Sequence, residues 1–278
     1  MYGGSFIGTR YLAVIAYCDE SYDDKGIVFT VAGFLAKEDE WARLADRWAT
    51  RCLQDGIDCY HATDCANGWN DFLPLSDEIC IALNTDLITY LTETKLAGFA
   101  VSISNKDFSD VISSEPKART ILGSDPYYLA FQLFILQVCH EINQVYSEYP
   151  LAFVFEQNEK VSGRAKRVYD DVRRENPELA ACMGKLTYAD RRKLTPLQAA
   201  DELAFEAMKN TLGWLQNRPD RMPIKRLKEA RVLSSLNVLG RNGIEQIVRD
   251  GKINFAGEPP EAPLASTNGP SDSRPLRE

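Results

Sequence analysis

Two short apolar runs, far apart in the chain, constrain its fold more than any other feature. Residues 11–18 (YLAVIAYC) and 151–155 (LAFVF) are almost wholly apolar and have polar residues on either side. Runs of this length without regular polar positions are typical of strands that are covered on both faces of a sheet. Segments with a helical spacing of apolar residues separate the two runs, so the sequence predicts an α/β fold.

The other predicted elements complete a mixed sheet. Residues 23–26 (DDKG) have turn composition and connect the first run to a second strand-like segment, 27–35, as an antiparallel hairpin. Further strands are predicted at 58–61, 96–104 and 183–188, and helices at 39–53, from Ser76, at 125–146, 160–174 and 195–212, with a mainly helical segment to about 255. In such sheets, functional sites form at the carboxyl ends of strands.

The ends of the chain differ from its interior. Residues 11–255 are predicted to form a single domain, after an N-terminal extension, 1–10, and before a tail, 256–278. The tail holds five of the thirteen prolines and few core-forming residues, so we expect it to be disordered. No stretch reaches about 18 consecutive apolar residues, and the extension has no long apolar segment. We therefore predict neither a signal peptide nor a membrane span.

Charge and cysteine content narrow the class of partner and the compartment. The net charge is −8, so the surface as a whole does not indicate nucleic-acid binding, and any nucleic acid would have to use a local basic patch or metal ions. Arg191, Arg192 and Lys193 form such a run, although a charge run is more often a solvated face. The seven cysteines are odd in number and include no Cys-x-x-Cys pair, which predicts reduced thiols and a cytoplasmic protein.

Each of the two apolar runs leads directly into an acidic residue. Asp19, followed by Glu20, comes after the first run, and Glu156 comes after the second. If the runs are strands, these carboxylates emerge from a rigid backbone at the sheet edge, which suits divalent-cation binding for phosphoryl chemistry. The alternative is that each acid only begins a polar turn or loop.

A third acid, Asp201, lies on the predicted inward face of the helix 195–212. Leu197, Ala204 and Met208 define that face, and Asp201 falls within it. Glu202 points away from it and is expected to be solvated. A buried carboxylate is costly unless it is paired or metal-bound, and no Lys or Arg occupies the same stripe within one turn. The sequence therefore favours a metal, or a distant basic residue, as the partner of Asp201.

Gln198 has two interpretations. Thr195 suits the N-cap and Pro196 the first helical position, so Gln198 stands where a capping box would place it. Gln198 could instead orient the substrate or Asp201. The capping interpretation is favoured.

His61 lies between Cys59 and Cys65, but the spacing matches no standard zinc motif, so no zinc is expected. His61 could instead act as a proton shuttle, or donate to a phosphate, near the acids. The sequence contains no GxxxxGK[ST] loop, GxGxxG fingerprint or GxSxG elbow. Nucleotide-fuelled and serine-hydrolase functions therefore lose their main support.

In their order and spacing these residues resemble a bacterial and phage family, the domain of unknown function 3800 family, which is placed in the ribonuclease H-like superfamily. Tyr22 stands where that family usually has glycine, and Glu156 where aspartate is frequent. The resemblance implies a ribonuclease H-like mixed sheet with helices on both faces, and an activity only by analogy within the superfamily. It covers about residues 11–212 and rests on Asp19-Glu20-Ser21, His61-Ala62 with Asp64 close behind, Glu156, and Leu197-Gln198-x-x-Asp201.

Two functions follow as hypotheses. The first is a divalent-metal-dependent nuclease or related phosphodiester hydrolase that binds one or two Mg²⁺ or Mn²⁺ ions. The second is a ribonuclease H-like scaffold that has lost catalysis and serves as a binding or assembly module. In the first hypothesis His61 aids proton transfer. The metal ligands are Asp19, Glu156 and Asp201, with Glu20 beside Asp19. The residues that contact the substrate are Gln198, Arg191, Arg192 and Lys193.

Overall fold

A computed structural model describes residues 14–145, 151–158 and 162–251 of the chain. The predicted N-terminal extension and tail lie outside the described residues. None of the described helices is both long and apolar enough to cross a membrane.

A six-stranded mixed sheet forms the centre of the molecule, as predicted. The order of its strands is β5-β4-β1-β2-β3-β6. β2 runs antiparallel to both β1 and β3, whereas the pairs β1–β4, β4–β5 and β3–β6 are parallel. The strands are β1 Val14–Tyr22, β2 Val28–Lys37, β3 Ala97–Ser104, β4 Leu151–Glu156, β5 Met183–Ala189 and β6 Leu233–Leu239.

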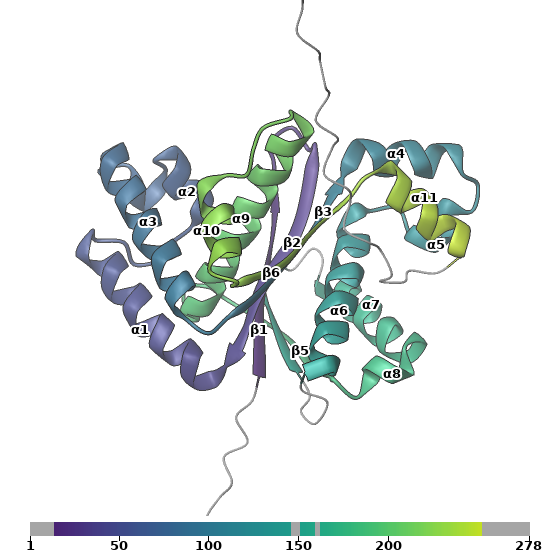
Figure 1. Cartoon of the computed structure of the whole chain (residues 1–278), viewed down its shortest axis with the longest axis horizontal. Helices are drawn as coiled ribbons and strands as arrows, with labels where there is room; N and C mark the ends of the chain where they lie inside the picture. Colours follow the sequence, from purple (N-terminus) through teal and green to yellow (C-terminus); the bar gives the residue numbers. More distant parts are fainter. Residues whose placement is uncertain (1–13, 146–150, 159–161, 252–278) are drawn as a thin grey trace, which may run out of the picture.

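Helices cover both faces of the sheet, with one hydrophobic core on each side (Figure 1). One side, called the α9 face, carries α1 Glu38–Gln54, α2 Ala62–Asn67, η1 Asn70–Phe72, α3 Asp77–Glu93, α9 Thr195–Leu215 and α10 Met222–Glu229. The other, called the α6 face, carries α4 Asn105–Ser114, α5 Ala118–Leu122, α6 Pro126–Val145, α7 Ser162–Glu175, α8 Pro177–Ala180 and α11 Arg241–Asp250.

Local sequence signals explain most of these elements. The turn between β1 and β2 closes where Gly26 adopts a positive φ of 63° and donates its N–H to the Asp23 carbonyl at 2.8 Å. Trp41, Leu44 and Trp48 are buried along one side of α1. Ser76 caps α3, because its side chain accepts a hydrogen bond from the backbone N–H of Ile79.

Three expectations about secondary structure are wrong. Residues 58–61 form no strand, because the Tyr60 N–H donates to the side chain of Gln198 and not to a neighbouring strand. Residues 233–239, which belong to the segment expected to be mainly helical, form strand β6. Their mixture of polar and apolar residues shows no clear strand pattern. β1 continues to Tyr22, so Asp19 and Glu20 lie within the strand and do not follow it.

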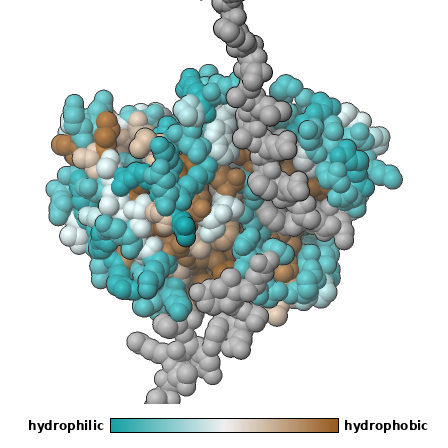
Figure 2. Space-filling model, viewed as in Figure 1, coloured by the Kyte–Doolittle hydropathy of each residue, from teal (hydrophilic) through white to brown (hydrophobic). Residues whose placement is uncertain are grey.

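The outer surface is mainly hydrophilic over the helices on both sides, and hydrophobic residues gather towards the centre of this view (Figure 2). Ile79 and Ile81 of α3 are apolar but not buried, with exposed fractions of 39% and 66%. The buried side of α3 is formed instead by Cys80, Leu83, Leu87, Ile88 and Leu91.

Candidate active site

The parallel pairing of β1 and β4 positions Asp19 and Glu156. Ile15 lies opposite Ala152 and Cys18 opposite Phe155, so Asp19, within β1, and Glu156, the last residue of β4, are neighbours on adjacent strands. Because side chains alternate along a strand, both acids lie on the α9 face, the side on which Tyr17 packs. Adjacent strands therefore present the two acids on the same side of the sheet.

Helix α9 presents Asp201 on this same face. Its side chain is buried, as predicted, and only 5% of the residue is exposed. Its Oδ2 accepts a hydrogen bond from the backbone N–H of Ala62 at 2.7 Å. The small residues Ala200 and Ala204 allow α9 to pack closely on β1 and β2. The sheet and α9 thus bring acids from three distant parts of the sequence to one face.

Arg191 supplies a positive charge to these acids. Its Nη1 lies 3.3 Å from Asp201 Oδ1, and its Nε lies 3.6 Å from Glu156 Oε1. Its backbone N–H donates to Glu156 Oε2 at 3.1 Å, which fixes the turn before α9 against the end of β4. Nη1 is buried and makes no hydrogen bond. Arg191 is therefore the distant basic partner of Asp201, ten residues earlier in the chain and outside the stripe that the helical spacing defines.

Burial and mutual repulsion raise the pKa values of the carboxyl groups. Burial raises the pKa of Asp19 well above its ordinary value, and the charges of Asp201 and Glu20 add to the effect, against the opposing charge of Arg191. Burial also raises the pKa of Asp201 and of Glu156, although Arg191 lowers both. One guanidinium is therefore too little positive charge for this group of acids, and a further cation would favour their ionised forms.

The structure does not bring Glu20 to the same side. Glu20 is the next residue after Asp19 in β1, so its side chain lies on the α6 face. There its Oε1 accepts a hydrogen bond from Asn158 Nδ2 at 2.9 Å. Burial raises its pKa, and the hydrogen bond from Asn158 opposes that shift.

His61 lies beside the acids, at the start of α2. Its Nδ1 is 2.9 Å from Asp64 Oδ2, and its Nε2 is 3.8 Å from Asp201 Oδ1. When the imidazole is neutral and Nδ1–H donates to Asp64, Nε2 has no proton and can accept one. Burial alone would raise the pKa of Asp64, but hydrogen bonds from Asn70 and His61 outweigh it, so that pKa is lowered. Asp64 is thus an ionised partner that orients the ring.

Gln198 does not form the predicted capping box. The N-cap is Leu194, with no capping side chain, and Thr195 is already helical. The Gln198 amide oxygen instead accepts hydrogen bonds from Trp48 Nε1 and the Tyr60 N–H, each at 3.1 Å. Its Nε2 donates to the Arg191 carbonyl, also at 3.1 Å. Gln198 therefore holds the segment before His61 and the segment at Arg191 in fixed positions relative to α9.

The basic run is divided by the fold. Arg191 turns in toward the acids, whereas Arg192 and Lys193 are exposed in the same turn. These two exposed cations lie next to the acid cluster in the chain, where an anionic ligand approaching the acids would meet them.

The chemistry of the donors suits a hard divalent cation, because the cluster offers carboxylate oxygens on rigid elements. Among the described residues, however, no group of three or more His, Cys, Asp or Glu side chains is arranged to hold a metal ion as it stands. The Arg191 guanidinium is instead the positive charge that contacts Glu156 and Asp201. The seven cysteines, all within the described ranges, are free thiols.

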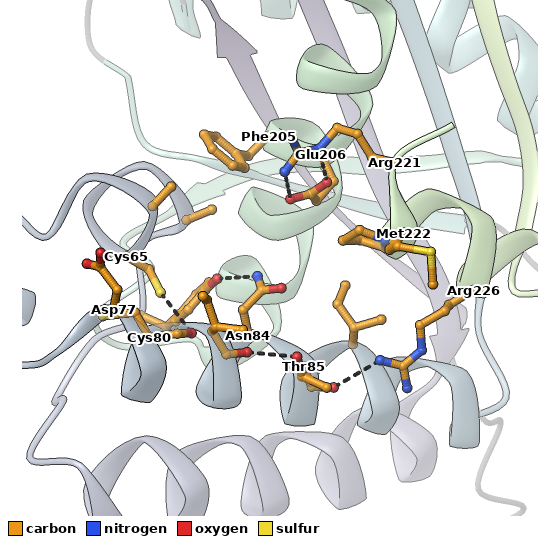
Figure 3. A pocket seen from close by; sticks show the side chains of 16 residues that line it. Cys65, Asp77, Cys80, Asn84, Thr85, Phe205, Glu206, Arg221, Met222 and Arg226 are labelled. Carbon is orange, nitrogen blue, oxygen red and sulfur yellow. Dashed lines mark hydrogen bonds and ion pairs between the residues drawn. The ribbon is translucent and has the colours of Figure 1, made fainter. Parts of the chain in front are cut away.

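A separate cavity of about 450 Å³ lies between α2, α3, α9 and the start of α10 (Figure 3). The segment of Tyr60 and Ala62 lines this cavity, and its backbone N–H groups also donate to Gln198 and Asp201. In its wall Glu206 forms two hydrogen bonds with Arg221, from Nε at 2.7 Å and from Nη2 at 3.0 Å.

Glu202 was expected to be solvated, and this is wrong. It is 0% exposed, because α9 is covered by other helices on the side away from the sheet. Its carboxyl group accepts hydrogen bonds from the Tyr60 hydroxyl at 2.6 Å and from Asn84 Nδ2 at 2.8 Å. Burial, with a contribution from the charge of Glu206, raises the pKa of Glu202 to about 8. Glu202 is thus protonated at neutral pH.

The raised pKa of Glu202 predicts that the folded protein loses stability as pH rises. In the unfolded chain the carboxyl group ionises above about pH 4.5, whereas in the folded protein it stays protonated until about pH 8. The folded state therefore binds one more proton between these values, which lowers the free energy of unfolding by about 1.4 kcal/mol per pH unit. Asp19 and Asp201 contribute in the same direction.

Denaturant unfolding of wild type and Glu202→Gln between pH 5 and pH 8 measures this effect. Glutamine resembles the protonated acid, so the variant should show a clearly shallower decline, with the remaining slope due to the other acids whose pKa is raised, namely Asp19, Glu20, Glu156 and Asp201. Equal slopes in the two proteins would contradict the assignment.

Comparison with known proteins assigns no family to the chain. No protein-family model matches the sequence, and a search of curated proteins finds no significant match.

Proposed function

We propose that the protein is a divalent-metal-dependent phosphodiester hydrolase that acts on nucleic acid, with a ribonuclease H-like fold. The proposal rests chiefly on one observation. Asp19 and Glu156 lie side by side on parallel strands, and Asp201 and Arg191 meet them on the same face. Rigid oxygen ligands on adjacent parallel strands, next to a guanidinium, suit phosphoryl transfer.

The residues of the cluster divide into distinct roles in this proposal. Asp19, Glu156 and Asp201 would hold Mg²⁺ or Mn²⁺, which when bound stabilises negative charge on the attacking and leaving oxygens. Arg191 binds a phosphate oxygen of the substrate, and the exposed Arg192 and Lys193 bind the adjoining backbone as a local basic patch.

Proton transfer in this proposal belongs to His61. Asp64 keeps the proton on Nδ1, so Nε2 is free to accept a proton near Asp201 and to return it to the leaving group. Gln198 acts indirectly, by holding the segments of His61 and Arg191 in place.

A hydrolysis assay tests the proposal directly. Single- and double-stranded DNA and RNA are incubated with the protein in Mg²⁺, in Mn²⁺ and in EDTA. Metal-dependent cleavage that is lost in Asp19→Asn and Glu156→Gln, but kept in Asp171→Asn, is the expected result. Asp171 is a matched control because it is an acid that lies on α7, on the α6 face. Activity in EDTA, or equal activity in all variants, would refute the proposal.

The pairing with Arg191 also supports a second candidate, a binding module without catalysis. In this candidate Arg191 is a permanent structural partner of Glu156 and Asp201. Nucleic acid would then bind with an affinity that does not change on addition of Mg²⁺ or EDTA, and no substrate would be cleaved. The same set of substrates in a binding assay separates the two candidates.

A further inference from the structure

Arg191 is an imperfect partner for the acids that it contacts. Its two side-chain ion pairs, at 3.3 and 3.6 Å, are longer than an ordinary charge-assisted hydrogen bond. Its buried Nη1 makes no hydrogen bond at all. A buried donor without an acceptor costs stability, and the attraction of Arg191 to the nearby carboxylates offsets that cost.

The same protein shows what a fully formed pair looks like. Arg221 contacts the buried Glu206 through two hydrogen bonds, at 2.7 and 3.0 Å. The guanidinium of Arg191 lacks this forked geometry, although Glu156 and Asp201 are both beside it. The comparison indicates that Arg191 satisfies the charge of the cluster without satisfying its hydrogen bonds.

The backbone at Arg191 is fixed independently of its side chain. The Arg191 N–H donates to Glu156, and the Arg191 carbonyl accepts from Gln198. Lys193 N–H and Leu194 N–H both donate to the Asp190 carbonyl, which closes the turn. The side chain is 25% exposed, so the guanidinium can rotate outward without unfolding the turn.

We propose, on the basis of the function proposed above, that Arg191 and a divalent cation compete for Glu156 and Asp201, and that the displaced guanidinium becomes the group that binds the substrate phosphate. A divalent ion beside the acids repels the guanidinium and takes over its electrostatic role. A phosphate offers the planar guanidinium two acceptor oxygens of one group. The present contacts are instead with one oxygen each of Glu156 and Asp201. Arg191 thus holds one positive charge beside the acids until metal and substrate arrive together.

Metal binding to the whole chain tests the competition without requiring activity. Mn²⁺ titrations by calorimetry compare wild type, Arg191→Gln and Arg192→Gln. Arg191→Gln is expected to bind Mn²⁺ at least about tenfold more tightly, because a like charge next to the ion is removed. Arg192→Gln removes an exposed charge from the neighbouring position and should differ from wild type by less than about threefold.

The outcomes separate this inference from the proposed function. Equal or weaker Mn²⁺ binding in Arg191→Gln would overturn the competition but leave the metal site standing. If neither protein binds millimolar Mn²⁺, the metal site itself fails, and the competition fails with it.

A second measurement avoids dependence on the folding of Arg191→Gln. In wild-type protein labelled with ¹⁵N-arginine, the Nε–H signal of Arg191, assigned by its loss in Arg191→Lys, should shift as diamagnetic Mg²⁺ saturates the site. The Arg221 signal should stay in place, because its pair with Glu206 is not part of the cluster. An unchanged Arg191 signal at saturating Mg²⁺ would overturn the competition.

Discussion

Replacing Asp201 with asparagine is expected to abolish metal-dependent hydrolysis while leaving the metal-free protein folded. Asparagine keeps an oxygen that can accept the hydrogen bond from the Ala62 N–H. Arg191 is not left alone, because Glu156 still contacts both its side chain and its backbone N–H. One buried negative charge is removed from a cluster in which burial already raises the pKa of Asp19 and of Asp201. We therefore expect the free energy of unfolding to change by less than about 1 kcal/mol, and activity to fall at least about 100-fold.

Denaturant unfolding without metal and single-turnover cleavage with Mg²⁺ measure the two parts of this prediction. Asp201→Ala is the informative companion, because it also removes the acceptor of the Ala62 N–H and should cost about 1–3 kcal/mol more. A loss of roughly 3–5 kcal/mol in Asp201→Asn would mean that Asp201 is the essential partner of a buried Arg191. That result would favour the structural role of the pair over the metal site.

The sheet could be predicted from the sequence because its central strands have simple signals. Residues 151–155 are a continuous apolar run, and 27–35 follow a turn that ends in Gly26. Strand β6 could not be predicted in this way. Its sequence, LSSLNVL, has no clear period, and it becomes a strand because it pairs with β3 across a long separation in the chain.

The acids of the site were predictable from local pattern, but their partner was not. The ends of the apolar runs indicated Asp19 and Glu156, and helical spacing indicated Asp201. The strand or helix that carries each of these acids determines the direction of its side chain. Arg191 lies in a turn, where no period indicates the direction of a side chain. Its position depends on hydrogen bonds to Glu156 and Gln198, which form only when β4, β5 and α9 come together.

Glu202 shows a different limit of helical spacing. A helix with one buried stripe would leave Glu202 in water, and the sequence was interpreted on that basis. In the structure residues 196–208 of α9 are buried throughout, between the sheet and other helices of the α9 face. A signal was present, since residues 197–208 contain only small or apolar residues apart from Gln198, Asp201, Glu202 and Glu206. A helix that is apolar all round is a buried helix, and its acids must then be paired or protonated.

Replacing Arg221 with methionine is expected to cause a large loss of stability, although this residue lies outside the acid cluster. The side chain of Glu206 is 3% exposed, and Arg221 provides two hydrogen bonds to it. Removing the guanidinium would leave this carboxylate buried near Glu202. Breaking a buried ion pair from one side costs about 3–5 kcal/mol. Because the Arg221 side chain is 44% exposed, water can partly replace it, so we expect a loss near the lower end, roughly 3 kcal/mol.

Two further variants show whether this loss comes from the stranded carboxylate. Arg218→Met removes an exposed arginine three residues earlier and should change the free energy of unfolding by less than about 0.5 kcal/mol. Arg221→Met combined with Glu206→Gln should recover most of the stability, because no buried charge then remains unpaired. Denaturant unfolding at neutral pH measures all of these proteins. If the double variant is no more stable than Arg221→Met alone, the loss must come from the packing of the arginine stem against the cavity and not from Glu206.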